Sequence, residues 1–274
     1  MAHDARRLRL GGMALANGLL VHGAHHWAAA VMADDGRTIV ASGERPRISA
    51  SRFDRLPLAR GIIRMAEAMM VVPVARRGLP EARTAMEDRP MGVIIVAAMI
   101  GSAIARRRIR SVAAQEAVAA VLGLAPTLIA LRTSDAAIWH GVEHKSIAAY
   151  ERGGEEGMAT SGTDAKEHSR CGSNLVLPLL VTTAVGNALA RRITGTRWRI
   201  VARGGVLALS VGASVEAFVF AERRPGHPLA RVIHGAGHAI QSGFATREPG
   251  DAELAVGRAA MQEILRVEAA PVPA

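Results

Sequence analysis

Residues 27–42 read WAAAVMADDGRTIVAS, and this stretch decides the fold of the N-terminal part of the chain. Two candidate strands, Trp27–Ala33 and Arg37–Ser42, flank the turn-forming triplet Asp34-Asp35-Gly36. Asp-Gly between apolar runs is a strong signal for a tight β-hairpin, because glycine adopts the backbone angles of the turn without strain. We therefore expect residues 1–50 to form a small antiparallel β unit, and helix across residues 27–42 would contradict this expectation.

The periodicity changes after Pro57. Apolar residues now recur at helical spacing, namely Leu58, Ile62, Met65, Ala66 and Met69. This pattern predicts an amphipathic helix that ends at Pro73, since proline cannot continue the hydrogen-bond ladder. Residues 76–90 are charged and contain proline and glycine, so we interpret them as a linker.

Four apolar stretches follow: Gly92–Ala105, Val112–Leu131, Asn174–Ala190 and Ile200–Ala221. A membrane-spanning helix needs about 20 apolar residues, so the first and third stretches are short for a span. The second contains Glu116 and the fourth contains Arg203, and the mean hydropathy of +0.18 is low for a multi-pass protein. Composition alone therefore supports buried helices of a soluble bundle and weak membrane spans equally well.

These patterns together predict an α+β protein, with a small N-terminal antiparallel β unit beside a mainly helical bundle. We expect four parts: a β unit at 1–55, an amphipathic helix and linker at 56–90, a helical core at 91–221, and a C-terminal loop, helix and tail at 222–274. The core would carry the loop 132–173 between its second and third apolar stretches.

The charge balance is strongly basic, with a net charge of +10 at pH 7. This value raises the hypothesis of an arginine-rich binder of nucleic acid or anionic lipid. Only Lys145 and Lys166 are lysines, and aromatic residues make up 3% of the chain, so few rings are present to stack on bases. The composition therefore argues against nucleic acid. The single cysteine, Cys171, excludes an intrachain disulfide and suits a reducing compartment.

The segment that carries chemistry is His140-Gly-Val-Glu-His144. Ser134 or Asp135 can cap a helix before it, and the glycines at 153 and 154 can end that helix. Histidines four residues apart on a helix project from one face and can close on one ion. His-x-x-Glu-His is the order in which two histidines hold zinc and the glutamate, here Glu143, acts as a general base. The alternative is a helix whose histidines make ordinary hydrogen bonds.

Zinc needs more than two protein ligands. His168 and Cys171 are the candidates, because their spacing in a turn that ends with Gly172 lets both side chains point inward. Glu151 lies seven residues beyond His144, about 10 Å along a helix axis, so we assign it a role behind the ligands or at a second site.

Other histidines carry weaker signals. His25 and His26 are more typical of surface or core residues than of ligands. His234 and His238 repeat the four-residue spacing, but Gly235 and Gly237 disfavour a helix, so a loop is expected there.

The central block resembles the YqhQ family. His140-Gly-Val-Glu-His-Lys145, Tyr150-Glu151 and His168-Ser-Arg-Cys171-Gly172-Ser are similar to the family's His-Gly-Ala-Glu-His-Lys, Tyr-Glu and His-Pro-Arg-Cys-Gly-Thr blocks. Weaker similarity extends to the opening Gly11–Gly18, to Arg60-Gly61, to Glu216 and to Gln241 with Thr246–Pro249. Met13, Asn17 and Val215 depart from the family's Gln, Glu and Tyr.

The resemblance implies a multi-pass membrane protein that is metal-dependent by prediction. Membrane lipids are then expected partners, in the cytoplasmic membrane of a bacterium. The basic connectors 106–110 and 191–199 favour the cytoplasm by the positive-inside tendency, whereas the N-terminus lacks an export signal. We expect the motif loop on the cytoplasmic side, with some stretches inserted only partly.

Two functions compete. The first is a membrane-associated hydrolase that uses zinc or another divalent metal, in which Glu143 activates water next to His140, His144 and a ligand from the His168/Cys171 turn. The second is a non-catalytic assembly or scaffold protein whose zinc is closed by all four side chains. Lys145, Tyr150, Glu151 and Arg170 are assigned to the surroundings of the ligands or to substrate contact.

Overall fold

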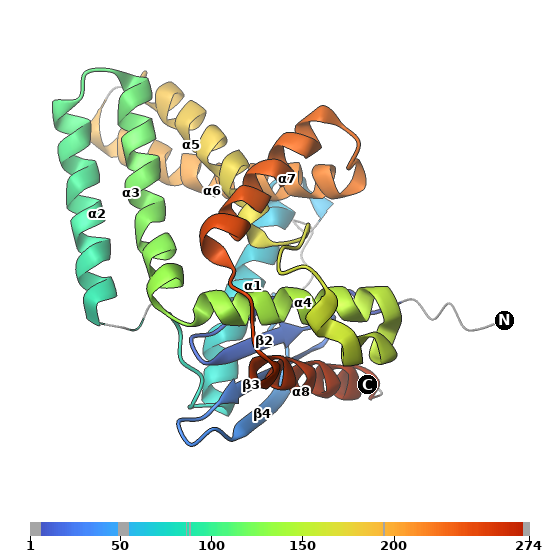
Figure 1. Ribbon diagram of the computed structural model, residues 1–274. Coiled ribbons are helices and arrows are strands. Elements are labelled where there is room, and N and C mark those ends of the chain that lie inside the picture. Colours follow the sequence, from blue (N-terminus) through green and yellow to red (C-terminus); the bar gives the residue numbers. More distant parts are fainter. Residues whose placement is uncertain (1–6, 49–54, 86, 88, 194, 271–274) are drawn as a thin grey trace.

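The computed structural model describes residues 7–48, 55–85, 87, 89–193 and 195–270. Residues 1–6 and 49–54 of the predicted β unit therefore lie outside the described residues. Figure 1 shows a compact α/β body from which long helices extend to one side.

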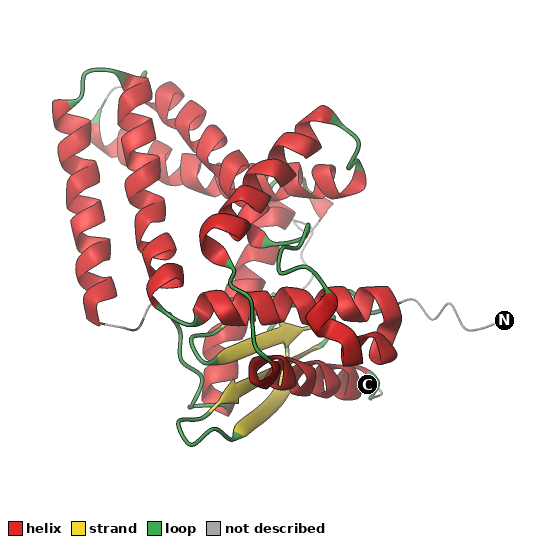
Figure 2. Ribbon diagram, viewed as in Figure 1, coloured by secondary structure: helices red, strands yellow, loops and turns green. Residues whose placement is uncertain are grey.

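The N-terminal part forms one antiparallel sheet, drawn in yellow in Figure 2. Its strands lie side by side in chain order. The strands are β1 (Gly11–Ala14), β2 (Gly18–His22), β3 (His26–Met32) and β4 (Thr38–Glu44). The turn between β3 and β4 contains Gly36, whose φ is +80°, and the N–H of Ala33 donates to the carbonyl of Arg37 at 2.9 Å. The predicted hairpin is confirmed.

Different helices cover the two faces of the sheet, because successive side chains of a strand point to opposite sides. One face packs on α4 (Ala136–Gly157) and α8 (Asp251–Glu268), and the other packs on α1 (Ala59–Gly78). The first face presents Leu19, Val21, Ala28 and Ala30; the second presents Leu20, Ala29 and Val31. Full burial of a leucine or valine contributes about 1.5–3 kcal/mol, so this packing fixes α4, which carries the motif.

Two helical hairpins extend away from this body (Figure 1). One consists of α2 (Arg89–Arg108) and α3 (Val112–Thr133), and the other of α5 (Val176–Ala190) and α6 (Thr196–Arg223). The two hairpins meet at the far end, where Arg106 of α2 and Arg191, directly after α5, both contact Glu116 of α3.

These hairpins expose apolar side chains to an unusual degree. Val93 is 71% exposed, Val121 67% and Ile200 67%, although globular proteins rarely leave such side chains together in the open. Within the part of the chain that the structure describes, three helices are long and apolar enough to cross a membrane: Val112–Thr133, Gly172–Ala190 and Ile200–Arg223. The expectation that the third apolar stretch is too short is wrong, because the 3₁₀ turn η3 (Gly172–Leu175) lengthens α5 at its start.

The predicted end of the first helix at Pro73 is also wrong. Helix α1 continues through Pro73 to Gly78. Val71, Ala75 and Leu79 lie along one side of this segment and are buried against the sheet. We attribute the continuation to this burial, which offsets the hydrogen bond that proline removes.

His234 and His238 lie in a helix rather than the expected loop. Helix α7 spans Pro228–Ile240 and is followed by the π turn η4 (Gln241–Ala245). The Nδ1 atom of His227 caps its start by accepting from the N–H of Leu229 at 3.1 Å, and Ile233 is buried against α6. A β-carbon on Gly237 would lie 1.9 Å from the side chain of Asn174, so the close packing of α7 requires a glycine there.

Candidate metal centre

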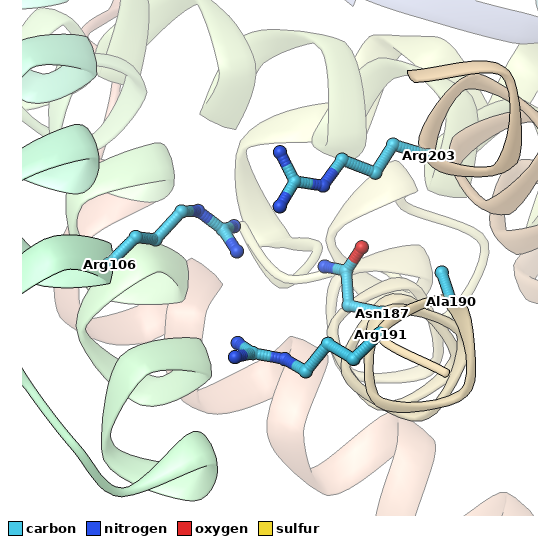
Figure 3. A pocket seen from close by; sticks show the side chains of 5 residues that line it. All are labelled: Arg106, Asn187, Ala190, Arg191 and Arg203. Carbon is cyan, nitrogen blue, oxygen red and sulfur yellow. The ribbon is translucent and has the colours of Figure 1, made fainter. Parts of the chain in front are cut away.

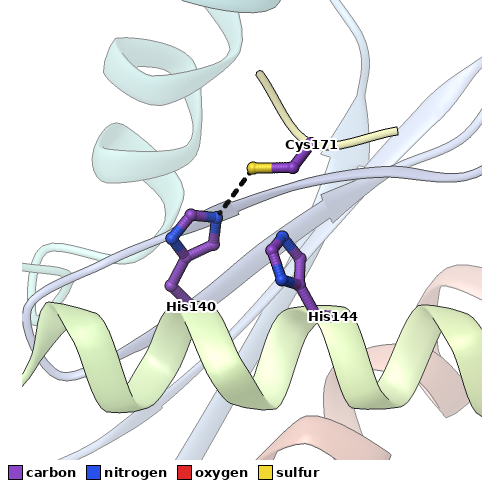
Figure 4. Close-up of side chains that lie close together, drawn as sticks. All are labelled: His140, His144 and Cys171. Carbon is purple, nitrogen blue, oxygen red and sulfur yellow. Dashed lines mark hydrogen bonds between the residues drawn. The ribbon is translucent and has the colours of Figure 1, made fainter. Parts of the chain in front are cut away.

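His140, His144 and Cys171 form a cluster between α4 and the start of η3. Their ligand atoms all lie within 4.8 Å of one another, and Figure 4 shows both imidazoles rising from α4 toward the sulfur. The Sγ of Cys171 is 3.3 Å from the Nε2 of His140, and the two ring centroids are 4.3 Å apart. The predicted approach of these three side chains to one point is confirmed.

Backbone carbonyls orient both imidazoles. The Nδ1 of His140 lies 2.9 Å from the carbonyl oxygen of Ala245, and the Nδ1 of His144 lies 2.6 Å from that of Lys166. A carbonyl only accepts, so each Nδ1 carries the proton and each Nε2 keeps its lone pair. The buried Nε2 of His144 has no hydrogen-bond partner among the described residues. This arrangement is typical of metal-binding histidines, whose second nitrogen donates to a carbonyl.

Cys171 precedes the first turn of η3, which continues into α5. Its sulfur accepts from the N–H of Ser173 at 3.5 Å. Burial raises the pKa of the Cys171 thiol, while the positive end of the helix that follows favours a thiolate. A cation held by the two imidazoles would add a stronger attraction for the thiolate.

Close backbone approaches build the frame around the cluster. A β-carbon on Gly141 would lie 2.3 Å from the carbonyl oxygen of Arg247, and the N–H of Arg247 donates to the carbonyl of Ala137 at 2.8 Å. The glycine inside the motif therefore lets residues 245–247 lie directly on α4. This contact places the carbonyl of Ala245 on His140.

Glu143 is buried beside the cluster. Its carboxylate lies 3.9 Å from the Nε2 of His140. Burial raises the pKa of Glu143 to about 7, with the histidines at 140 and 168 opposing this effect. Gly12 of β1 covers the carboxylate, since a β-carbon there would lie 2.6 Å from it. Burial also lowers the pKa of His144 to about 3, so this imidazole is neutral and able to bind a cation.

A pocket with an open volume of about 150 Å³ lies against the cluster. It is lined by the three cluster side chains together with Leu10, Gly11, Gly12, His22, Glu143, Ile147, His168, Arg170 and Gly172. Glu143 thus shares one small polar space with the candidate ligands.

His168 lies at the wall of this pocket, with its ring centroid 5.8 Å from that of His144. Its Nδ1 accepts from the N–H of Arg170 at 3.2 Å, and its Nε2 lies 3.2 Å from the carboxylate of Glu151. Both ring nitrogens are therefore engaged. Burial lowers the pKa of His168, and Glu151 also forms an ion pair with Arg170. The assignment of His168 as a metal ligand stays a prediction.

Lys145 and Tyr150 do not line the pocket; they fix neighbouring segments of the chain to α4. The Nζ of Lys145 donates to the carbonyls of Gly162 and Asp164 at 2.9 and 2.6 Å, which fastens the end of η2 (Met158–Thr163) to α4. The hydroxyl of Tyr150 accepts from the N–H of Leu8 at 3.2 Å, and its ring packs in the core beneath the sheet.

The sequence interpretation missed His22 and the two carbonyls that orient the imidazoles. Every residue has a backbone carbonyl, so the roles of Ala245 and Lys166 could not be predicted from residue type. His22 pairs with Gly11 across β1 and β2 and lines the pocket. Recognising β2 as a strand and pairing it with the glycine-rich opening would have found it.

The fold and the site define a mixed α/β protein with a histidine–cysteine cluster and helical hairpins that include segments of membrane-spanning length. Residues 133–267 match the family model described as "Protein of unknown function (DUF1385)". The chain is 28% identical over 133 residues to "Uncharacterized protein YqhQ" of Bacillus subtilis (strain 168), which covers 48% of this chain and 41% of that relative. Residues 133–267 are therefore similar to a domain of unknown function, and the chain is similar to YqhQ over part of its length, in line with the motif resemblance. No solved structure matches it.

Proposed function

We propose that this protein is a membrane-associated, metal-dependent hydrolase, in which His140, His144 and Cys171 hold zinc or another divalent metal and Glu143 acts as the general base. The proposal rests above all on the buried Nε2 of His144, which has no partner among the described residues and belongs to a cluster with two further donors. Leaving a buried polar atom unpaired costs about 1–3 kcal/mol, so a cation that accepts its lone pair accounts for it.

The donor set favours zinc. Zinc commonly binds imidazoles and thiolates in tetrahedral sites, whereas magnesium and calcium prefer oxygen ligands. Both imidazoles are oriented by carbonyls before any ion binds, which reduces the entropy lost on binding.

The pocket beside the cluster favours catalysis over a structural role. Three protein ligands leave one position of a tetrahedral site open, and a bound ion polarises a water molecule in such a position. Glu143 lies in the same pocket, with a pKa near neutrality that suits proton acceptance. Burial keeps this carboxylate away from bulk solvent, and Lys145 donates instead to the carbonyls of Gly162 and Asp164.

The alternative is a scaffold protein with a structural zinc. His168 supports it, because its ring lies 5.8 Å from that of His144 and could complete a set of four ligands after a rotation away from Glu151. In a site closed by four protein ligands no metal-bound water is present, so Glu143 would have no catalytic function. The effect of replacing Glu143 therefore separates the two proposals.

The membrane association rests on the exposed apolar faces of the two hairpins and on the three helices of sufficient length. We place the protein in the cytoplasmic membrane of a bacterium, with the motif on the cytoplasmic side, where a free thiol stays reduced. A reporter fused after α8, which packs on the body that carries the site, tests this side. Activity of a periplasmic reporter at that end would reverse the assignment.

Elemental analysis of the purified protein tests the metal site. Wild type and His238→Ala, whose histidine is exposed on α7, should each carry about one zinc per chain, and His144→Ala should lose it. Equal metal content in all three proteins would refute the site. The zinc-loaded protein is then tested on chromogenic carboxylic and phosphate esters and a quenched peptide. Turnover that Glu143→Gln abolishes while metal is retained supports the hydrolase, and no turnover on any of these classes favours the scaffold.

A further inference from the structure

The far end of the two helical hairpins contains a second polar site, distant from the metal centre. Arg106 of α2, Arg191 at the end of α5 and Arg203 of α6 converge on a pocket that also contains Asn187 (Figure 3). Its open volume is about 130 Å³, several times the roughly 30 Å³ that a water molecule occupies in the liquid.

The charges in this pocket do not balance. Glu116 accepts from Arg106 and Arg191, both at 3.2 Å, and from the side-chain amide of Asn187 at 2.9 Å. Three guanidinium groups against one carboxylate leave two positive charges. Arg203 has no ionic partner among the residues whose side chains are described. It is the fourth residue of the candidate span Ile200–Arg223 and so lies near one end of it, where arginine side chains of membrane helices reach the headgroup region.

Two apolar grooves lie near this pocket: one contains Glu116, which is bonded to Arg106 and Arg191, and the other shares Arg106 with the pocket. One lies between α3 and α5, has a volume of about 580 Å³ and reaches Glu116 at one end. The other lies between α2 and α3, has a volume of about 370 Å³ and reaches Arg106. The first groove is lined by Val112, Ala113, Ala117, Ala120, Leu180, Val181, Ala184, Val185 and Ala188. A cationic pocket thus lies beside apolar grooves on the surface of the hairpins.

We propose that this end of the hairpins binds an anionic phospholipid, with the headgroup phosphate in the arginine pocket and acyl chains in the two grooves. The phosphate would neutralise the two excess charges, and guanidinium groups bind phosphate through paired hydrogen bonds. Basic pockets between membrane helices bind lipid headgroups in this way. The inference rests on the membrane association proposed above and is independent of the metal chemistry.

The experiment uses the full chain, stripped of lipid in a mild detergent, and measures binding of three probes by native mass spectrometry and thermal shift. The probes are dioctanoyl phosphatidylglycerol, dioctanoyl phosphatidylcholine and glycerol 3-phosphate. We expect phosphatidylglycerol to bind at least tenfold more tightly than phosphatidylcholine, and more weakly as salt rises. Glycerol 3-phosphate should not bind measurably, because it lacks the chains that fill the grooves.

Arg203→Gln should weaken phosphatidylglycerol binding about tenfold, because it removes one charged hydrogen bond to the phosphate. Arg107→Gln removes the same charge from an exposed side chain that does not line the pocket, and should leave binding unchanged. Ala117→Phe should also weaken lipid binding by filling a groove. Equal binding of both lipids, equal binding of glycerol 3-phosphate, or no effect of Arg203→Gln would overturn the proposal.

Failure here is distinguishable from failure of the proposed function. Arg203→Gln should retain the zinc content of wild type, so the metal site is measured separately. Fractionation of cells reports membrane association by itself. A protein that sediments with membranes yet shows no preference for phosphatidylglycerol would refute only the lipid site.

Discussion

The Nδ1 of His140 donates a hydrogen bond to the backbone carbonyl of Ala245, 105 residues further along the chain, at 2.9 Å. The orientation of a motif histidine is therefore set by the π turn that follows α7. Since the N–H of Arg247 donates to the carbonyl of Ala137 on α4 in the same region, the candidate metal centre is assembled from two segments that are distant in sequence.

Gly141→Ala should weaken metal binding although Gly141 is no ligand. The added methyl group would lie 2.3 Å from the carbonyl of Arg247 and push residues 245–247 off α4, so His140 loses the carbonyl that orients it. Loss of such an outer contact costs about 10–100-fold in metal affinity, which competition with a fluorescent chelator measures. Gly153→Ala, on the same helix with open space around it, is the control. Unchanged affinity in Gly141→Ala would contradict this role of the glycine.

Gly12→Ala should separate metal binding from catalysis. Its methyl group would lie 2.6 Å from the side chain of Glu143 and force the carboxylate out of its position, while the three candidate ligands stay in place. We expect wild-type zinc content and a rate of hydrolysis lower by about 10²–10⁴-fold, the usual contribution of a general base. Gly172→Ala lines the same pocket without a steric conflict and should keep its rate. Loss of zinc in Gly12→Ala would show instead that β1 supports the ligands.

Gln241→Ala should lower stability, because Gln241 ties α7 to the turn that carries Cys171. Its buried side chain accepts from the N–H of His168 at 2.8 Å and donates to the hydroxyl of Ser173 at 2.8 Å. Leaving these groups unpaired costs about 1–3 kcal/mol, visible as a lower midpoint of thermal unfolding. Ser242→Ala, which removes an exposed hydroxyl one residue later, should have the midpoint of wild type. Equal midpoints for both variants would show that water replaces Gln241.

Local patterns predicted the parts of this molecule that depend on short stretches of chain. The Asp-Gly turn fixed β3 and β4, and the four-residue spacing of His140 and His144 put both rings on one face of α4. The helix α7 was mispredicted from Gly235 and Gly237, because its stability comes from burial of Ile233 and from a close contact that only glycine permits. Helix propensities of single residues do not include such tertiary contacts.

The position of Glu143 next to the candidate ligands followed from the motif, but the environment of its carboxylate did not. The cover over its carboxylate is Gly12, which belongs to a strand more than a hundred residues away in sequence. Because glycine has no side chain, the sequence gives no sign of such a contact. Only the glycine-rich opening shared with the family pointed to this region at all.

The buried carboxyl of Glu143 should make the stability of the metal-free protein depend on pH. Its pKa of about 7 in the folded protein exceeds the value of 4.5 expected when unfolded. Between these values the folded state holds a proton that the unfolded state has lost, so the contribution of Glu143 to stability falls as pH rises from about 4.5 to 7. His144 acts in the opposite direction, because its lowered pKa of about 3 favours the folded state as pH rises through the acidic range.

Comparison with Glu143→Gln removes the contribution of His144, which both proteins share. In the presence of a chelator, the two proteins should differ least near pH 4.5, where the carboxyl is protonated in the folded state. Above pH 7 the glutamine variant should gain up to about 3 kcal/mol relative to wild type, because one pKa unit corresponds to about 1.4 kcal/mol. Denaturant unfolding at a series of pH values measures this difference. A difference that does not change between pH 4.5 and 7 would mean that the carboxylate is solvated, and would remove the reason for assigning it the role of base.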